Sequence, residues 1–354
     1  MSEKMMVYRR EVLSEFLTEL FLKTDMSRED AEYHAYALTE TNLWGVDSHG
    51  VIRVPAYFRR MMNGAINTKP DTKTIKGSLG LEVIDGDDGS GFIVGKRAME
   101  RAVELAKEHN VGIVGAIRSN HFGASGLYAK IAAENNMVGI AMTNVLPLIV
   151  APGASRPVVG NNPFAISIPT HGEFPFLLDM SLSKVAGGKL TLAIKKGEKI
   201  PTDWATDSEG KPTDDPQKAF EGFLLPMGEF KGLGLAYAVD ILAGVITGGV
   251  FSHQMRSMYA NPEDPSLTGH LMMAINIPAI IDNDEMKNRM SEYYERLVET
   301  PMWNGGRMYL PGELEYLKKQ ERLKDGIPLP KKTVEELEAL AAEMNVKTPL
   351  ARVE

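Results

Sequence analysis

The spacing of apolar residues predicts a helical N-terminal section. Apolar positions recur at helical intervals over 8–23, 28–43 and 51–62. Ser27 with Asp30 three positions later resembles the start of a helix, which fits the second of these segments. Residues 8–62 are therefore expected to be almost entirely helical.

Beyond this section, short apolar runs typical of buried strands alternate with helical segments. The polar segment 200–223 contains three prolines and predicts a surface loop. The segment 231–247 is a glycine- and alanine-rich helix that is apolar nearly all round, which predicts burial on most sides. The pattern predicts strands at 81–86, 111–118, 138–144, 164–169, 176–180 and 271–277, and helices at 91–110, 123–136, 183–196 and 284–299.

This order of elements predicts an α/β or α+β protein whose second domain is inserted into the first. Boundaries near residues 118 and 280 give a mainly helical domain of 1–118 together with 280–354, and a sheet domain of 119–279. The length of 354 residues is consistent with two domains. Because no G-x-G-x-x-G motif follows an expected strand, we do not expect a standard Rossmann fold.

Composition removes several classes of function. The net charge of −8 disfavours nucleic acid and anionic membrane surfaces as partners. The chain has no cysteine, so disulfides, thiolate metal sites and cysteine nucleophiles are excluded. The seven histidines lack the spacing of a metal site, and no G-x-S-x-G serine nucleophile motif occurs. We expect a cytoplasmic protein, since no signal peptide or membrane-spanning segment is evident.

Two polar segments at the ends of expected elements are candidates for chemistry. His49 and Arg53 are four residues apart and can share one helix face, where they offer a proton donor and a carboxylate clamp. The plainer alternative makes Ser48 a helix cap and His49 a bystander. His121 follows an apolar strand and precedes a helix, a position that favours ligands but also suits an ordinary turn.

Two further positions also have a structural and a functional interpretation. Asp179 ends an expected strand, so its carboxylate caps the next helix or orients a catalytic imidazole. Lys231 begins the glycine-rich helix, where it would hold a phosphate or mark a tightly packed turn.

Taken together, six motifs in matching order resemble the malate/L-lactate dehydrogenase family that is distinct from the classical lactate dehydrogenases. The resemblance implies a nicotinamide-dependent oxidoreductase with a non-Rossmann nucleotide-binding domain. It also implies a homodimer with the active site near the subunit interface. The motifs are SHGVIRVPAYFRR (48–60), RSNHFGASGLYA (118–129), GNNPFAISIP (160–169), DMSLS (179–183), LLPMGEFKGLGLAYAVDIL (224–242) and LPGE (310–313).

The resemblance also implies roles for individual residues. Ser48, His49 and Arg53 match the substrate motif, and His121 matches the second histidine of the family. Many members have a serine where this chain has Val145, so only the backbone there could contact the cofactor. Cofactor contacts are implied for Asp179, Met180, Ser181, Phe230, Lys231, Gly312 and Glu313.

These expectations define a mechanism as a hypothesis. A hydride passes between NAD or NADP and a 2-hydroxy or 2-oxo acid, of the malate, lactate, ureidoglycolate or sulfolactate type. Arg53 binds the carboxylate, and Asp179 orients the acid–base histidine. We place His49 slightly ahead of His121 for that role. The alternative is reduction of a cyclic imino acid such as Δ1-piperideine-2-carboxylate.

Overall fold

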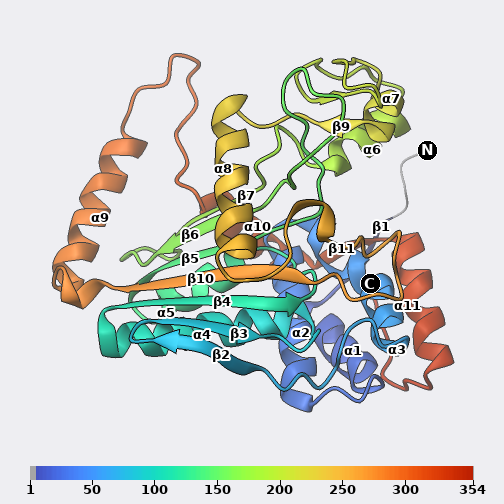
Figure 1. The fold of residues 1–354 in the computed structure, drawn as a ribbon, viewed down its shortest axis with the longest axis horizontal. Helices are drawn as coiled ribbons and strands as arrows, with labels where there is room; N and C mark the ends of the chain where they lie inside the picture. The colour runs from blue at the N-terminus through green and yellow to red at the C-terminus, as the bar shows by residue number, and fades with distance from the viewer. Residues whose placement is uncertain (1–4, 354) are drawn as a thin grey trace.

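A seven-stranded mixed sheet forms the centre of the computed structural model, which describes residues 5–353 (Figure 1). The strand order is β2-β3-β4-β10-β5-β6-β7, and within it only β3 and β4 are parallel neighbours. A Rossmann sheet is mostly parallel, so the predicted non-Rossmann α/β class is confirmed. The strands are β2 (Lys73–Ser78), β3 (Leu81–Asp85), β4 (Val111–Ser119), β5 (Met137–Thr143), β6 (Phe164–Ile168), β7 (Phe176–Met180) and β10 (Thr268–Asn276).

Helices cover both faces of this sheet. On one face lie α4 (Gly91–His109) and α5 (Gly126–Glu134), and on the other lies α8 (Phe230–Asp240), which continues as a π-helical turn, η3 (Ile241–Val245). Glycines allow the close approach on the first face. A Cβ on Gly112 would overlap the Ala102 carbonyl of α4, and a Cβ on Gly139 would overlap the Ala129 carbonyl of α5.

The two ends of the chain build one helical region beside the sheet (Figure 1). Strands β1 (Met5–Tyr8) and β11 (Ile327–Pro330) pair in antiparallel fashion. The predicted start of the second helix is confirmed, because the Ser27 hydroxyl accepts a hydrogen bond from the Asp30 amide. The helices are α1 (Arg10–Leu22), α2 (Arg28–Leu43) and α3 (Val54–Met62), joined by α10 (Glu313–Asp325) and α11 (Lys331–Glu343).

The polar segment that was expected to be a loop carries regular structure. It contains β8 (Ala205–Thr206), α7 (Pro216–Glu221) and the start of β9 (Phe223–Leu224), and it packs against α6 (Gly187–Lys196). Asp215 caps α7 by accepting hydrogen bonds from the amides of Gln217 and Lys218. The prolines thus delimit short elements here rather than exclude them.

Helix α8 differs from its expected burial. It buries Ala236, Val239 and Ala243 against the sheet, while Ile241 and Ile246 on the opposite side are exposed. The exposed fraction of Ile246 is 67%. Helix α8 is thus apolar nearly all round, yet one of its faces is exposed in the single chain.

Helix α9 (Asn283–Val298) extends from the far end of β10 and contains no buried residue (Figure 1). Short 3₁₀ turns, η4 (Ser252–Gln254) and η5 (Ile277–Ala279), flank β10. None of the helices described between residues 5 and 353 is long and apolar enough to cross a membrane.

The division into 1–118 with 280–354 and 119–279 stays a prediction. The central sheet continues through the boundary near residue 118, because β4 from the first segment pairs with β10 from the second. The N-terminal segment also supplies β2 and β3 to the same sheet.

Candidate active site

The segment that carries Ser48, His49 and Arg53 forms two consecutive 3₁₀ turns, η1 (Asp47–His49) and η2 (Val51–Arg53), before α3. The side chain of Asn42, on α2, holds both turns. Its Nδ2 donates to the Asp47 carboxylate at 2.6 Å, and its Oδ1 accepts from the Val51 amide at 2.8 Å. A Cβ on Gly50 would overlap this amide group, so glycine is required there.

Helix α10 fixes the same turns from the other side. The guanidinium of Arg322 binds both carboxylate oxygens of Asp47, at 2.5 and 2.9 Å. A two-point contact of this kind fixes orientation as well as position. The substrate motif is therefore anchored to elements from both ends of the chain.

Arg53 presents the end of its side chain to solvent. Its Nε donates to the Ser48 carbonyl at 2.6 Å, which fixes the plane of the guanidinium. No hydrogen bond or ion pair joins its two terminal nitrogens to another residue in the described part of the chain. Those nitrogens are therefore available to a carboxylate ligand.

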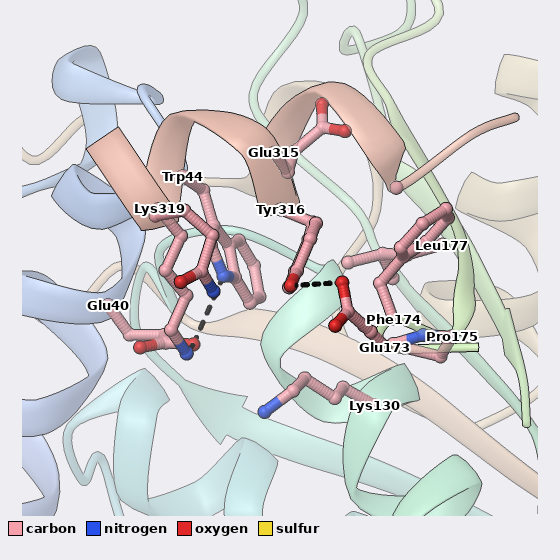
Figure 2. A pocket seen from close by; sticks show the side chains of 12 residues that line it. Glu40, Trp44, Lys130, Glu173, Phe174, Pro175, Leu177, Glu315, Tyr316 and Lys319 are labelled. Carbon is pink, nitrogen blue, oxygen red and sulfur yellow. Dashed lines mark hydrogen bonds and ion pairs between the residues drawn. The ribbon is translucent and has the colours of Figure 1, made fainter. Parts of the chain in front are cut away.

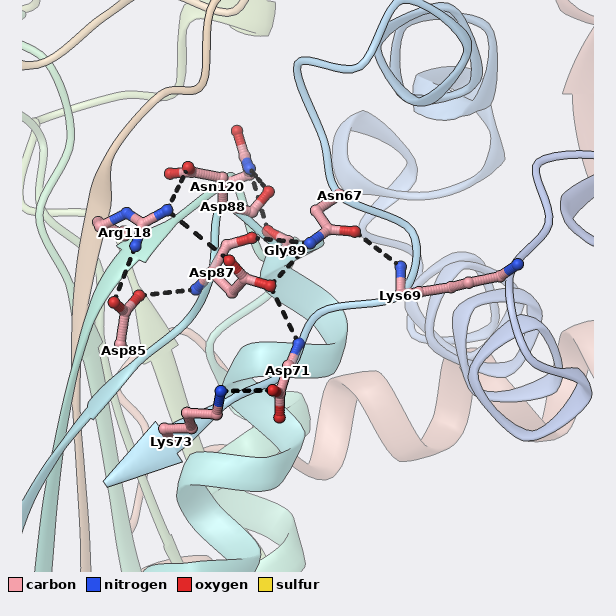
Figure 3. Close-up of polar contacts among 10 residues, drawn as sticks. All are labelled: Asn67, Lys69, Asp71, Lys73, Asp85, Asp87, Asp88, Gly89, Arg118 and Asn120. Carbon is pink, nitrogen blue, oxygen red and sulfur yellow. Dashed lines mark hydrogen bonds and ion pairs between the residues drawn. The ribbon is translucent and has the colours of Figure 1, made fainter. Parts of the chain in front are cut away.

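Strand β4 ends in a strained turn that directs the second histidine toward the first. Arg118 has a φ of 51°, in the left-handed region, and its guanidinium pairs with Asp85 at 2.8 Å and Asp88 at 2.7 Å (Figure 3). Asn120 is fully buried, and its Nδ2 donates to the carbonyls of Asp88 and Gly89. Both side chains tie the loop to the segment before α4.

The two candidate histidines meet at this point, although 72 positions separate them in the sequence. The rings of His49 and His121 are stacked with their centroids 5.6 Å apart. Burial lowers the pKa of His49 to about 4, and the charge of Arg53 adds to this effect. Burial also lowers the pKa of His121 well below its usual range, aided by the charges of His49 and Arg53. Both rings are therefore neutral at pH 7.

Each histidine has a hydroxyl partner at Nδ1. The Tyr57 hydroxyl lies 2.7 Å from Nδ1 of His121, and the Ser48 hydroxyl lies 2.8 Å from Nδ1 of His49. The Gly123 amide makes a longer contact with the same nitrogen of His121, at 3.3 Å. Among residues 5–353, no hydrogen bond reaches Nε2 of either ring, so this nitrogen is available to a ligand.

Tyr57 is a site residue that the sequence analysis missed. It lies on α3, one helical turn after Arg53, and it is buried. The spacing of four residues between Arg53 and Tyr57 was the available signal, since it places both side chains on one helix face.

His270 is a second residue that was missed. It is fully buried on β10, where Nδ1 lies 2.8 Å from the Thr143 hydroxyl and Nε2 lies 2.8 Å from the Ser119 hydroxyl. Its ring is stacked on Phe122, the neighbour of His121, at 4.6 Å. His270 thus supports the loop that carries His121. The spacing of residues in the sequence did not indicate a role for His270, because its contacts join residues on three different strands.

Asp179 does not contact either candidate histidine in this structure, which differs from the expected pairing with His49. Its carboxylate accepts a hydrogen bond from the Gly126 amide at the start of α5, at 2.7 Å. The residue is exposed as a whole, but burial of its carboxylate raises the pKa of Asp179 to about 6, and the Gly126 hydrogen bond opposes this shift. The structural interpretation, a carboxylate at a helix start, is the one that the contacts support.

The expected cofactor residues Met180, Ser181 and Lys231 belong to adjoining segments. The Leu182 carbonyl accepts from the Met227 amide at 3.0 Å, which joins the DMSLS segment to the turn before α8. Phe230 and Lys231 are exposed at the first turn of α8. The structure thus brings these two motifs together.

Gly312 and Glu313 lie at the start of α10, beside the outer edge of β7. Gly312 has a φ of 94° and packs against Pro175 and Leu177, so a side chain would be strained there. A cavity of about 200 Å³ opens beside it, between α2, α5 and α10 (Figure 2). The LPGE motif therefore shapes the edge of the strand that carries Asp179.

Glu313 is buried and fully bonded within the chain. Its carboxylate accepts from Arg307 at 2.5 Å and from the Tyr294 hydroxyl at 2.9 Å. Burial opposes ionisation, but the bonds from Arg307 and Tyr294 outweigh it and lower the pKa of Glu313. A direct contact of this carboxylate with a cofactor would require these bonds to rearrange.

The backbone at Val145 is also partly engaged. Its amide donates to Oδ1 of Asn162 at 2.8 Å, while Nδ2 of Asn162 donates to the Ala236 carbonyl of α8. A cofactor contact at this position is therefore left to the carbonyl. Among the described residues, no group of three His, Asp or Glu side chains is arranged to hold a metal ion.

Comparison with known proteins extends these observations to the whole chain. Residues 8–338 match the model of the family described as malate/L-lactate dehydrogenase. The chain is 39% identical to the malate dehydrogenase of Pyrococcus abyssi, over 96% of this chain and 95% of that protein. The structure of sulfolactate dehydrogenase from Methanocaldococcus jannaschii is similar at a TM-score of 0.92 and 36% identity, covering 97% of this chain and 98% of the other.

Relatives named for NAD(+) and for NADP(+) both occur among the similar proteins. The predicted family, fold class and dehydrogenase activity are confirmed by these matches together with the mixed sheet. The chain therefore belongs to the malate/L-lactate dehydrogenase family, whose members are NAD(P)-dependent oxidoreductases that act on the CH–OH group of hydroxy acids.

Proposed function

We propose that Arg53, His49, His121 and Tyr57 form the site in which a 2-oxo acid is reduced and a 2-hydroxy acid is oxidised. The observation that carries this proposal is the meeting of two stacked histidines beside an arginine with unpartnered terminal nitrogens. Arg53 would bind the substrate carboxylate through two parallel hydrogen bonds. The substrate oxygen would then lie against a histidine Nε2.

His121 has more support than His49 as the acid–base residue, which reverses the order suggested by the sequence. Its Nδ1 partner, Tyr57, is buried, whereas Ser48 is exposed on the same short turn as His49. A tyrosine hydroxyl can accept a hydrogen bond from Nδ1–H both in the charged ring and in the neutral ring that keeps its proton on Nδ1, so Nε2 is free to lose and regain a proton. His121 would therefore donate a proton from Nε2 to the carbonyl oxygen during reduction and take it back during oxidation.

The residues that would hold the cofactor fit a nicotinamide dinucleotide. Lys231 supplies an exposed cation and Phe230 an exposed ring at a helix start, and the segment that carries Ser181 is hydrogen-bonded to the turn before this helix. Asp179 and Met180 at the end of β7, and Gly312 and Glu313 beside the beginning of that strand, complete the proposed cofactor set. When bound, the cofactor supplies or accepts the hydride. NAD and NADP are both compatible with this set.

We propose a short hydroxy acid with a second acidic group as the substrate, of the malate or sulfolactate type. The similarity to proteins named malate dehydrogenase and sulfolactate dehydrogenase supports this choice. Both compounds carry a carboxylate next to the reacting carbon, which matches the single free guanidinium end of Arg53. Lactate, ureidoglycolate and cyclic imino acids are the alternatives to test.

We further propose a homodimer formed through the exposed face of α8 and η3. Leu235, Ile241, Val245 and Ile246 are exposed on this face, and Asp240, the only charged residue between 232 and 249, is buried. A continuous uncharged face of this kind indicates a protein partner. The mainly helical part, 1–118 with 280–354, would bind substrate, and 119–279 would bind the cofactor. The cytoplasm remains the proposed location.

The test is a panel of 2-oxo acids and one cyclic imine, measured with NADH and with NADPH. We expect reduction of the oxo form of malate or sulfolactate, and its reversal with the hydroxy acid. The variant His121→Ala should lose about two to four orders of magnitude in kcat, and His49→Ala less. Absence of oxo acid reduction with either cofactor would overturn the function. A larger loss in His49→Ala would restore that residue as the acid–base group.

A further inference from the structure

An aromatic ring lies over the guanidinium that is proposed to bind substrate. Cζ of Arg53 is 5.8 Å from the centroid of the Tyr259 ring, within the range of a cation–π contact. Tyr259 belongs to the segment 257–266, which connects η4 to β10, and its exposed fraction is 61%. The contact therefore joins two segments of the chain that are far apart in the sequence.

The segment 257–266 is attached to the helix that follows Arg53. Arg60, on α3, donates from Nη2 to the Asp264 carbonyl at 2.6 Å and from Nε to the Pro262 carbonyl at 3.4 Å. Asn63, at the end of the same helix, donates to the Pro262 carbonyl at 3.1 Å. The segment is therefore held at several points on the element that positions Arg53.

The same segment is also joined to the loop of His121. Nη2 of Arg60 donates to Oδ1 of Asn120 at 3.2 Å, and the Ser266 amide donates to the same oxygen at 3.0 Å. Asn120 precedes His121 directly. The segment that carries Tyr259 is thus attached to both sides of the proposed site.

The buried position of Arg60 is energetically unfavourable, which indicates that its attachment to the segment 257–266 has a role. Its exposed fraction is 2%, and burial lowers its pKa. Its hydrogen bonds go to neutral carbonyl and amide oxygens, and Nη1 has no hydrogen-bond partner within residues 5–353. The charge of Asp264 opposes this pKa shift without forming an ion pair with Arg60, and a buried guanidinium that lacks an ion-pair partner is unfavourable by itself. The burial of Arg60 is better explained by its hydrogen bonds to the segment 257–266 than by a contribution of Arg60 to the stability of the protein.

From these contacts we infer that Tyr259 is a substrate-positioning residue. Arg53 is fixed on one edge by its Nε bond to the Ser48 carbonyl and on one face by the Tyr259 ring. The remaining edge, with both terminal nitrogens, faces the ligand. The ring thereby limits the rotation of Arg53, so that a carboxylate binds in one orientation. This inference rests on the proposed function, because it requires Arg53 to be the carboxylate ligand.

The test compares Tyr259→Leu with Tyr259→Phe and Phe220→Ala in the full-length protein. Tyr259→Leu should raise the KM for the best 2-oxo acid about three- to fivefold, as expected for the loss of a cation–π contact. Its kcat, its affinity for NADH by fluorescence and its Tm should stay close to wild type, since Tyr259 is largely exposed. Tyr259→Phe keeps the ring and should keep the wild-type KM. Phe220→Ala removes another exposed ring, on α7, and should change nothing.

The possible failures are distinguishable. An unchanged KM in Tyr259→Leu, with active wild-type enzyme, would overturn the positioning role alone. Equal KM increases in the leucine and phenylalanine variants would assign the effect to the hydroxyl and also contradict it. A wild-type enzyme that reduces no 2-oxo acid would instead contradict the proposed function. Arg60 is not used as the primary test, since a change at this buried residue risks unfolding.

Discussion

The Tyr57 hydroxyl lies 2.7 Å from Nδ1 of His121, and the two rings are stacked with their centroids 5.9 Å apart. Tyr57 is buried, and burial raises its pKa above the usual value, so its hydroxyl remains protonated. A neutral hydroxyl in a fixed position can hold His121 in one orientation through both protonation states. This contact links the helix of Arg53 to the loop of His121.

Replacement of Tyr57 by phenylalanine removes this contact and keeps the ring. We expect Tyr57→Phe to lower kcat by about tenfold to hundredfold, because His121 loses the partner that orients its proton. Steady-state kinetics with a 2-oxo acid measure the effect, and NADH binding should be unchanged. Tyr33→Phe, on α2, provides a matched control that should retain wild-type kcat. An equal loss in both variants would mean that the effect is general destabilisation.

The lowered histidine pKa values predict the pH dependence of hydroxy acid oxidation. Oxidation needs a neutral imidazole, and the pKa of His49 is about 4 while that of His121 is also below 6.5. A histidine with an ordinary pKa of about 6.5 would be roughly 90% protonated at pH 5.5, which would lower kcat/KM about tenfold. We instead expect less than about a twofold change in kcat/KM between pH 7.5 and 5.5. A tenfold fall centred near pH 6.5 would contradict the lowered values.

The pKa of Asp179 is raised, whereas the pKa values of the two histidines are lowered. The direction of this shift leads to another prediction. The pKa of Asp179 in the folded protein is about 6, against an ordinary value of 3.8, so the folded state holds this proton more tightly than the unfolded state. Ionisation of Asp179 therefore costs stability above pH 6, and the cost disappears as the pH falls below that value. Asp179→Asn should raise Tm at pH 7.5 by about 1 to 3 °C, with a smaller gain at pH 5.

The matched control for this prediction is Asp207→Asn. Backbone hydrogen bonds from Lys211 and Glu209 lower the pKa of Asp207, so its charged form is favoured in the folded state. The control should therefore give no increase in Tm at pH 7.5. A Tm that rises equally in both variants would indicate a general effect of reduced negative charge.

Much of the site could be predicted from sequence because its residues lie in compact motifs. Ser48, His49 and Arg53 lie in two consecutive turns, and His121 follows a strand that was recognisable by its apolar residues. From the sequence, His49 and His121 were alternatives for one role, and the stacking of their rings was not predicted. The stacking depends on Asn42, Asn120 and Arg322, whose contacts join segments far apart in the sequence.

The remaining differences have physical causes of the same kind. The pairing of Asp179 with His49 stays a prediction, because in this structure the carboxylate accepts a hydrogen bond from the Gly126 amide, as a helix start favours. Strand β2 was missed because its residues are all exposed at the edge of the sheet and lack an apolar pattern. Helix α8 was expected to be buried because composition shows that a face is apolar but not whether another part of the chain covers it.

The exposed face of α8 therefore supplies the last prediction. If a second copy covers this face, a charge placed at its centre would be buried without a partner, which opposes association. Ile241→Glu should convert a dimer into a monomer, as measured by sedimentation equilibrium at micromolar concentration. Ile75→Glu, on the exposed edge strand β2, is the matched control and should leave the mass unchanged. A dimer that survives Ile241→Glu would exclude this face as the interface, whereas a wild-type monomer would exclude the homodimer itself.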